Sequence, residues 1–425
     1  MGDKMFIDVI VIVFFIVSIV FTFKYRFIQF KSFKETNNIL VKKKSKTAYK
    51  TFMLSLASNI GTGNIVGIST CLIYGGPGSL FWMWLFAIFS SVLSLMENTL
   101  AQIYKVKING EYRGGSSFYI KNGLNNKVIA YIIAVFLILT NTVLFQPLQV
   151  NTVSETIHIV FGTNKIIIFG CFIIFTIFII FNGTKRIVRF SEIIVPIMSI
   201  GYIFITTIII IVNIKSIPGV ISLIFKDAFK YKSIFGGFGS SCLLIGVKRS
   251  LFSHEAGLGT MPTISAMSEI KRPIDQGFIQ VIGIFFDTIV LCSLTGIVIL
   301  IYNMDLKAYS GYDMILKMFS IMLGDFGTYV GVFFLLSFAI ATVVSEYYLG
   351  ESNLIFITKN KKGKIIGLLY KLLFCFGIFI GVFLSTNSIW IIVDMGIILI
   401  GILNVYSLIK MRKIFERELL KYYNC

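Results

Sequence analysis

The sequence predicts an all-α integral membrane protein with about eleven transmembrane helices, and three observations support this fold class. Hydrophobic residues make up 56% of the chain and charged residues only 14%, whereas soluble domains carry roughly a quarter charged residues. Apolar runs recur along the chain and reach the roughly 20 residues that a helix needs to cross a hydrocarbon core. The basic residues fall in short loops between these runs, which is the pattern that orients a membrane protein.

The apolar runs give the order of the predicted helices. The first run is too long for a cleaved signal peptide, so it is expected to remain as a helix. The basic loop 24–49 is predicted to be cytoplasmic, so the N-terminus lies outside. After eleven crossings the C-terminus, which is also basic, lies in the cytoplasm. The predicted segments are 5–23, 50–74, 79–104, 128–150, 166–182, 187–213, 236–268, 274–301, 326–348, 365–384 and 387–410.

Charge and reactive residues restrict the function. The net charge of +19 is explained by the loops that orient the chain in a lipid bilayer, so no nucleic-acid partner is expected. The 6 cysteines show no paired spacing and the chain has 2 histidines, so neither a disulfide framework nor a zinc site is indicated. No His-Glu zinc motif, paired Asp motif or Ser-His set is present. The chain is therefore not expected to be an enzyme.

Two predicted segments contain a stretch that interrupts the helix, at 59–64 and at 253–260. Each glycine in such a stretch weakens a helix by about 1 kcal/mol relative to alanine. Inside a bilayer the freed backbone groups need protein, water or ligand partners. Helix breaks at matched places in two halves of a chain are the best sequence sign of a transporter binding site. They suit an occluded site better than an open channel.

The two breaks match at an offset of 196 residues. Five crossings separate equivalent points, and five is an odd number, so the two repeats must be inverted in the membrane. This predicts a first helix and basic loop at 1–49, a five-helix repeat at 50–213 and a second at 214–425. The identical pairs are Gly61 with Gly257, Gly63 with Gly259, Ile68 with Ile264, Ser69 with Ser265, and Pro77 with Pro273.

A broken helix exposes amide N–H groups at one end and carbonyl groups at the other, with opposite partial charges. The N–H groups of 61–63 suit the carboxylate of a zwitterionic amino acid, because glycine allows close approach. Carbonyls near Phe252 and Ser253 suit its ammonium group. Asn64 and nearby carbonyls offer oxygen ligands for sodium. The alternative is that these glycines only allow helices to pack closely.

Acidic side chains inside apolar runs are costly and usually functional. Glu255 lies within the second break and Asp287 lies in mid-segment, so both are gating or coupling candidates. Lys248 and Arg249 just precede the break and are the expected ion-pair partners of either acid. His254 is either a proton-titrating group or a packed, hydrogen-bonded side chain.

Glu97 also lies in an apolar run, but Lys105 follows it at the end of the same segment. A structural ion pair between these two residues is therefore the expected role of Glu97.

With these motifs together, the chain from about residue 45 to 410 resembles the alanine/glycine:cation symporter family, also called sodium:alanine symporters. The resemblance is carried by Gly-Thr-Gly-Asn-Ile-Val-Gly at 61–67, Gly-Gly-Pro-Gly at 75–78 and the run 246–259. It implies a LeuT-type fold with an extra N-terminal helix in the plasma membrane, and sodium-coupled symport of alanine, glycine or a similar small neutral amino acid. No cofactor is implied besides sodium as the coupling ion.

The resemblance also implies roles for individual residues. Asn64 and Thr342 are sodium-site candidates. The implied substrate-binding residues are Thr62, Gly63, Gln149, Phe252, Ser253, Gly257 and Gly259.

The chain departs from the family pattern at four places. His254 stands where the family has Asn, and Ser116 where it has Pro. A pair of threonines is replaced by Ala341-Thr342, and an expected proline is missing at Leu403-Asn404. Two alternatives follow: a transport-deficient sensor of the same fold that binds an amino acid, or a symporter driven by protons instead of sodium.

Overall fold

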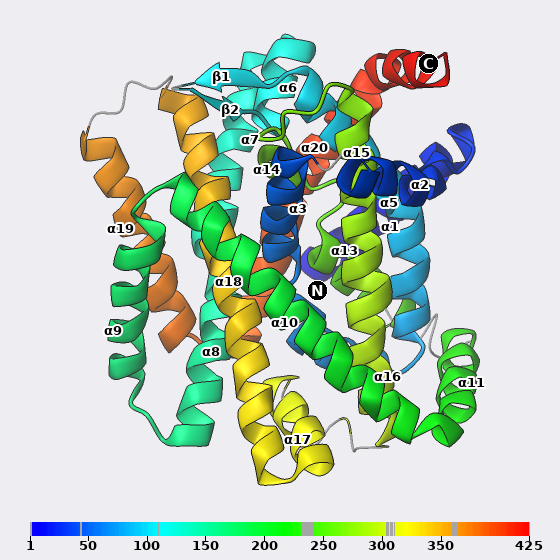
Figure 1. The fold of residues 1–425 in the computed structure, drawn as a ribbon, viewed down its shortest axis with the longest axis vertical. Helices are drawn as coiled ribbons and strands as arrows, with labels where there is room; N and C mark the ends of the chain where they lie inside the picture. The colour runs from blue at the N-terminus through cyan, green and yellow to red at the C-terminus, as the bar shows by residue number, and fades with distance from the viewer. Residues whose placement is uncertain are drawn as a thin grey trace.

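The computed structural model of the chain describes residues 2–42, 45–108, 110–230, 241–302, 306, 309, 311–358 and 364–424. Positions 43 and 44 of the basic loop and 236–240 of the seventh predicted segment lie outside these ranges. Long helices run along the tall axis of the molecule (Figure 1). The strands β1 and β2 and the C-terminal end of α20 lie at its upper end.

The described elements are almost all helical, and β1 and β2 form one antiparallel hairpin in which Lys107 faces Tyr112. The first half contains α1 (Gly2–Lys24), η1 (Ile28–Lys31), α2 (Ser32–Thr36), η2 (Asn37–Lys42), α3 (Lys46–Asn59), η3 (Thr62–Asn64), α4 (Val66–Gly75), α5 (Ser79–Ile103), β1 (Val106–Ile108), β2 (Glu111–Arg113), α6 (Ser116–Gly123), α7 (Lys127–Leu139), η4 (Thr140–Leu144), α8 (Gln146–Phe161), α9 (Lys165–Phe175), η5 (Thr176–Ile180) and α10 (Thr184–Val212). The second half contains η6 (Ile214–Ser216), α11 (Ile217–Ala228), α13 (Cys242–His254), α14 (Met261–Ser265), α15 (Pro273–Ile284), η7 (Phe285–Cys292), α16 (Ser293–Ile301), α17 (Gly311–Leu323), α18 (Asp325–Thr358), α19 (Lys364–Phe383) and α20 (Thr386–Tyr423).

Helix length and composition confirm the prediction of an all-α membrane protein. In the described part of the chain, 8 helices are long and apolar enough to cross a membrane. The three other predicted segments correspond to α3 with α4, α9 with η5, and α13 with α14, each of which is short or interrupted. The long helices cover 7–24, 79–103, 127–161, 184–212, 273–301, 325–358, 365–383 and 388–423.

Both predicted breaks are present. The first separates α3 from α4, with the short turn η3 between them. The second separates α13 from α14, and here the backbone enters the left-handed region at Glu255 (φ 53°), Gly257 (φ 82°) and Gly259 (φ 83°). Glycine adopts this conformation at little cost, whereas a residue with a side chain rarely does. The two glycines therefore explain how the chain stays non-helical between the end of α13 and the start of α14.

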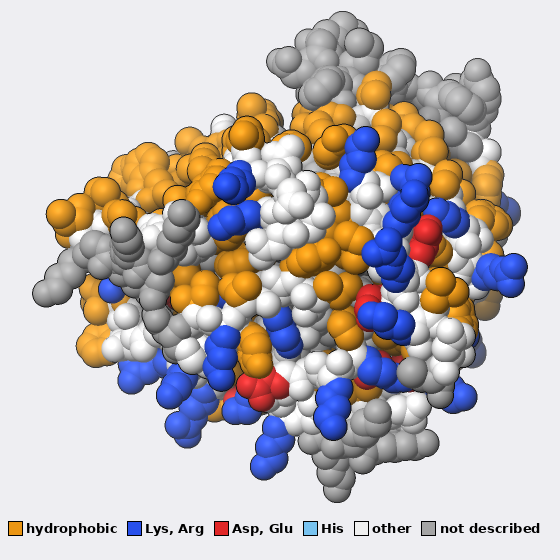
Figure 2. Space-filling view, turned by 90° about the horizontal axis from the view of Figure 1, so that it is seen from above, with side chains coloured by type: hydrophobic (Ala, Val, Ile, Leu, Met, Phe, Trp, Pro, Cys, Tyr) orange, Lys and Arg blue, Asp and Glu red, His pale blue; other side chains and the backbone are white. Residues whose placement is uncertain are grey.

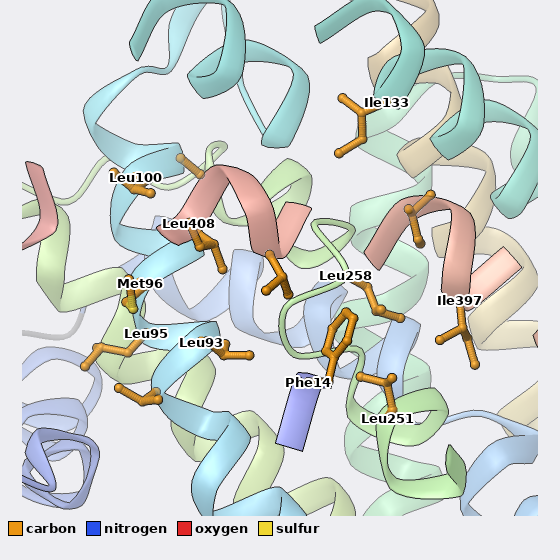
Figure 3. Packing of buried hydrophobic residues seen from close by; sticks show 14 of the residues in the cluster. Phe14, Leu93, Leu95, Met96, Leu100, Ile133, Leu251, Leu258, Ile397 and Leu408 are labelled. Carbon is orange, nitrogen blue, oxygen red and sulfur yellow. The ribbon is translucent and has the colours of Figure 1, made fainter. Parts of the chain in front are cut away.

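The second break is enclosed by helices from distant parts of the chain. The helix α5 packs against α13 and α15, and α1 packs against α5, α13 and α20. Figure 3 shows Phe14 of α1 among Leu93 of α5, Leu251 of α13 and Leu258 of the break itself. The predicted extra helix at the N-terminus thus forms part of the core beside the second break.

Candidate functional site

The first break is held by a side chain of α8. The amide and the hydroxyl of Thr62 both donate to Oε1 of Gln149, at 3.0 and 2.8 Å. Both residues are buried. The amide of Thr62, which we predicted to bind the substrate carboxylate, thus donates to the neutral side-chain oxygen of Gln149 in the structure.

Two glycines of the first break have no room for a side chain. A Cβ atom on Gly61 would lie 2.5 Å from Oγ1 of Thr342 and 3.1 Å from Oε1 of Gln149. A Cβ atom on Gly63 would lie 3.0 Å from the ring of Phe252, which is 5% exposed. The ring of Phe252 therefore covers the first break directly.

A buried polar cluster lies between the first break, α13 and η7. Asp287 accepts hydrogen bonds from the side-chain amide of Asn64, from Oγ of Ser253 at 2.7 Å and from Oγ1 of Thr288 at 2.9 Å. These four residues, called the Asp287 cluster below, are all buried. The cluster joins two sequence predictions, Asn64 as a sodium ligand and Asp287 as a coupling residue, in one place.

The expected cationic partners of these acids are elsewhere. Lys248 pairs with Asp8 of α1, and Nη1 of Arg249 lies 4.0 Å from Asp394 of α20. The prediction that Lys248 or Arg249 neutralises Glu255 or Asp287 is therefore wrong. Among the described residues no Lys or Arg forms an ion pair with Asp287, so its charge is balanced only by hydrogen-bond donors.

Thr342 meets the end of α3. Its Oγ1 lies 3.0 Å from the carbonyl oxygen of Ala57, 3.4 Å from that of Ile60 and 3.1 Å from that of Phe338. One hydroxyl hydrogen cannot serve three acceptors at once, so four oxygens converge on this point. A set of hydroxyl and unwound backbone carbonyl oxygens is the kind that coordinates sodium in broken-helix transporters.

The second break is held by a charged side chain of α5. Oε1 of Glu97 accepts from the amide of Gly257 at 3.1 Å, and Oε2 accepts from the amide of Gly259 at 3.1 Å. The side-chain amide of Asn404 also donates to Oε2, at 2.8 Å. Lys105 instead donates to Gln102 and to the carbonyl of Ser268, so the predicted pair of Glu97 with Lys105 is wrong.

The carbonyl groups of the second break are satisfied too. The side-chain amide of Asn404 lies 2.9 Å from the carbonyl oxygen of Gly257, and Oγ of Ser116 donates to that of Gly259 at 3.0 Å. Tyr119 in turn donates to Oδ1 of Asn404. Every backbone polar group of Gly257 and Gly259 thus bonds to protein, and their predicted contact with substrate stays a prediction.

Sequence reasoning missed the role of Asn404. Its only signal in the sequence is a single Asn in an apolar run, and the family pattern identifies it only as a missing proline. Its bonds to Glu97 and to the carbonyl of Gly257 show that it holds α20 against α5 and against the break between α13 and α14.

His254 and Glu255 cap the end of α13. Nδ1 of His254 accepts from the amide of Ala256 at 3.0 Å, so the proton of a neutral ring lies on Nε2, 3.1 Å from Oγ of Ser90. The ring also stacks on Phe86. Glu255 accepts from Oγ1 of Thr260 at 2.5 Å. Both residues are buried and their bonds are local, and gating or coupling roles for them stay predictions.

A helical membrane fold with a polar site between two broken helices is the architecture of a secondary transporter. The chain belongs to the sodium:alanine symporter family, because the model of that family matches residues 1–425. This confirms the resemblance that the motifs indicated.

Individual relatives agree with this assignment. The chain is 37% identical over 346 residues to the amino-acid carrier protein AlsT of Bacillus subtilis (strain 168), covering 80% of this chain and 74% of the relative. It is 30% identical over 384 residues to the sodium/proton-dependent alanine carrier protein of Bacillus sp. (strain PS3), covering 86% of each.

Among solved structures, the fold is similar to that of MhsT in complex with L-phenylalanine. The TM-score is 0.59 and the sequence identity is 15%, over 83% of this chain and 87% of the other. The LeuT-type fold expected from the family is confirmed.

Proposed function

We propose that this chain carries alanine or glycine across the plasma membrane together with sodium, by alternating access around the two helix breaks. The family assignment supports amino-acid transport coupled to sodium or protons. The residues at the breaks support the finer choices of substrate and ion.

The difference between the two breaks carries the proposal. At the first break the amide of Thr62 is held by the neutral oxygen of Gln149, which a stronger acceptor can displace. At the second break the amides are held by the carboxylate of Glu97, whose charge repels another carboxylate. The substrate carboxylate therefore binds at Thr62 and Gly63, and its ammonium group faces the carbonyls near Phe252 and Ser253.

The same geometry favours a small side chain. Phe252 lies against Gly63, with a ring carbon 3.0 Å from where a Cβ atom would be. Gln149 and Thr342 close the neighbouring space at Gly61. A bulky substrate would have to move the ring of Phe252. Alanine or glycine needs little more room than the side-chain amide of Gln149 that it displaces.

Two places suit the coupling ion. The Asp287 cluster offers carboxylate, amide and hydroxyl oxygens with no basic partner among the described residues. The second place is Thr342 with the carbonyls of Ala57 and Ile60. Both contain residues of the first break, so cation binding there would order the backbone that receives the substrate.

The orientation and the division of the chain are part of the proposal. Figure 2 shows the molecule from above, with Lys and Arg side chains spread over this face. The preference of basic loops for the cytoplasm supports a C-terminus inside and an N-terminus outside. The matched breaks support inverted five-helix repeats at 50–213 and 214–425, preceded by the first helix and loop at 1–49.

The test is uptake of labelled alanine and glycine into proteoliposomes. An inward sodium gradient is expected to drive accumulation above equilibrium, and dissipating that gradient is expected to stop it. Accumulation driven by a proton gradient without sodium would replace sodium by protons as the coupling ion. Binding without accumulation under either gradient would favour the sensor alternative and contradict the proposal.

A further inference from the structure

A second aromatic ring packs against Phe252. The ring centroids of Phe252 and Trp390 of α20 are 5.4 Å apart, in an edge-to-face arrangement. Trp390 is 7% exposed and its ring also reaches Gly67 of α4. The two rings together cover the first break on the side that faces the N-terminal end of α13. The orientation predicted from the basic loops places this side outside the cell.

A guanidinium group lies on the outer ring. Arg249 of α13, one turn before Phe252, stacks on Trp390 with 3.6 Å between the guanidinium carbon and the ring centroid. Its side chain is 12% exposed. The carboxylate of Asp394 is 4.0 Å from Nη1, which is beyond hydrogen-bond distance. The cationic group is thus largely buried, and its neighbouring acid does not satisfy its donors.

Several donors in this cluster have no acceptor. Nε and Nη1 of Arg249 and Nε1 of Trp390 are buried and make no hydrogen bond with the described residues. Lys248, the preceding residue, differs in this respect because it pairs with Asp8. A buried donor without an acceptor is costly, and the planar guanidinium fork matches a carboxylate better than any other common acceptor.

We propose that Arg249 and Trp390 form an outer docking site for the carboxylate of the amino-acid substrate, which then passes Phe252 to reach the first break. This inference rests on the proposed function. It adds a second binding position, which the substrate occupies before it reaches the first break. Asp394, beside the guanidinium, receives the ammonium group of the same zwitterion. The site therefore accepts free amino acids and discriminates against analogues that lack the carboxylate.

The chain allows this site to be observed alone. It has 3 tryptophans, so Trp82→Phe with Trp84→Phe leaves Trp390 as the only source of tryptophan fluorescence. Adding Gly63→Leu fills the central site, because a Cβ atom there already meets Phe252. L-Alanine is then titrated into this variant, and L-alaninamide serves as the probe without a carboxylate.

Alanine is expected to change the Trp390 signal in the Gly63→Leu background, and alaninamide is not. Arg249→Gln is expected to weaken the alanine response about tenfold or more, as for the loss of a hydrogen bond to a charged group. Lys226→Gln removes a charge from an exposed position on α11 and is expected to leave the response unchanged. The variant with Trp82→Phe and Trp84→Phe that keeps Gly63 is called the Gly63 parent. A response to alanine in this parent that disappears in Gly63→Leu would overturn the docking site.

A second measurement does not depend on Gly63→Leu being folded. In the Gly63 parent, Arg249→Gln is expected to slow alanine association about tenfold and to leave dissociation within about twofold. An unchanged association rate would overturn the proposal. No alanine binding to the parent at all would instead contradict the proposed function, so the two failures are distinguishable.

Discussion

Replacing Glu97 by Gln tests whether a negative charge is needed at the second break. The substitution keeps the shape of the side chain but turns one acceptor oxygen into an NH2 group. The least harmful orientation places this group at the position of Oε1, where it faces the amide of Gly257. The remaining oxygen can still accept from Gly259 and Asn404. One hydrogen bond is lost, and two donors are brought face to face.

The cost follows from these bonds. A hydrogen bond to a charged acceptor contributes about 1.5–3 kcal/mol, and this amount is lost at Gly257. The two surviving bonds end on a neutral oxygen and become roughly half as strong. We therefore expect Glu97→Gln to destabilise the second break by about 2–5 kcal/mol. If substrate binding requires this break to be ordered, the Kd for alanine should rise by at least about thirtyfold.

The assay is equilibrium binding of labelled alanine to the purified protein at saturating sodium. Asn404→Ala and the double variant complete a cycle, for which a coupling energy of about 1–3 kcal/mol is expected, because the two side chains share a bond. The matched control is Glu192→Gln, since Glu192 is also an acid of a long helix but pairs with Lys50 away from the break. A Kd for alanine in Glu97→Gln equal to that of the parent protein or of Glu192→Gln would refute the role of the charge.

Three further substitutions test the first break and the ion positions. Gln149→Glu places a fixed carboxylate beside Thr62 and should weaken alanine binding at least about hundredfold, measured against Gln149→Ala, which removes the same bonds without adding a charge. Thr342→Val removes the hydroxyl from the carbonyls of α3, so the sodium concentration for half-maximal uptake should rise about tenfold with little change at saturating sodium. Asp287→Asn removes the only anion of the Asp287 cluster and should reduce the affinity for sodium more than Thr342→Val; an unchanged sodium dependence of uptake would exclude the cluster as an ion site.

The helix breaks were predictable because they are local properties of the chain. The glycines at 61, 63, 257 and 259 weaken a helix whatever its tertiary contacts are. Their equal spacing in both halves shows that the two breaks occupy equivalent positions in the sequence. The partners at the breaks were not predictable in the same way. Sequence proximity predicts Lys105, eight positions away, as the partner of Glu97, whereas its partners in the structure are more than 150 residues away.

The same reason explains the ion pairs of α13. Sequence proximity assigned Lys248 and Arg249 to the acids of the second break. In the fold these side chains point to α1 and α20 instead. A helix has several faces, and only the packing of neighbouring helices decides which face meets which partner.

The departures from the family pattern are better explained as changes to the framework than as a loss of transport. Ser116 donates to the carbonyl of Gly259, Asn404 bonds to Glu97 and to Gly257, and His254 accepts from the amide beside it. All four bonds lie at the second break, and a proline at the position of Ser116 or Asn404 would have no side-chain donor there.

At the first break the residues needed for exchange are retained. Thr62 still meets Gln149, and Thr342 still meets the carbonyls of α3 although Ala341 beside it lacks a hydroxyl. The departures at Ser116, His254 and Asn404 therefore add hydrogen bonds at the break whose amide donors are already occupied by Glu97. They leave unchanged Thr62 and Gln149 at the first break, where we propose that Gln149 gives way to a substrate carboxylate, so the residues that the proposed carrier needs for amino-acid binding are retained.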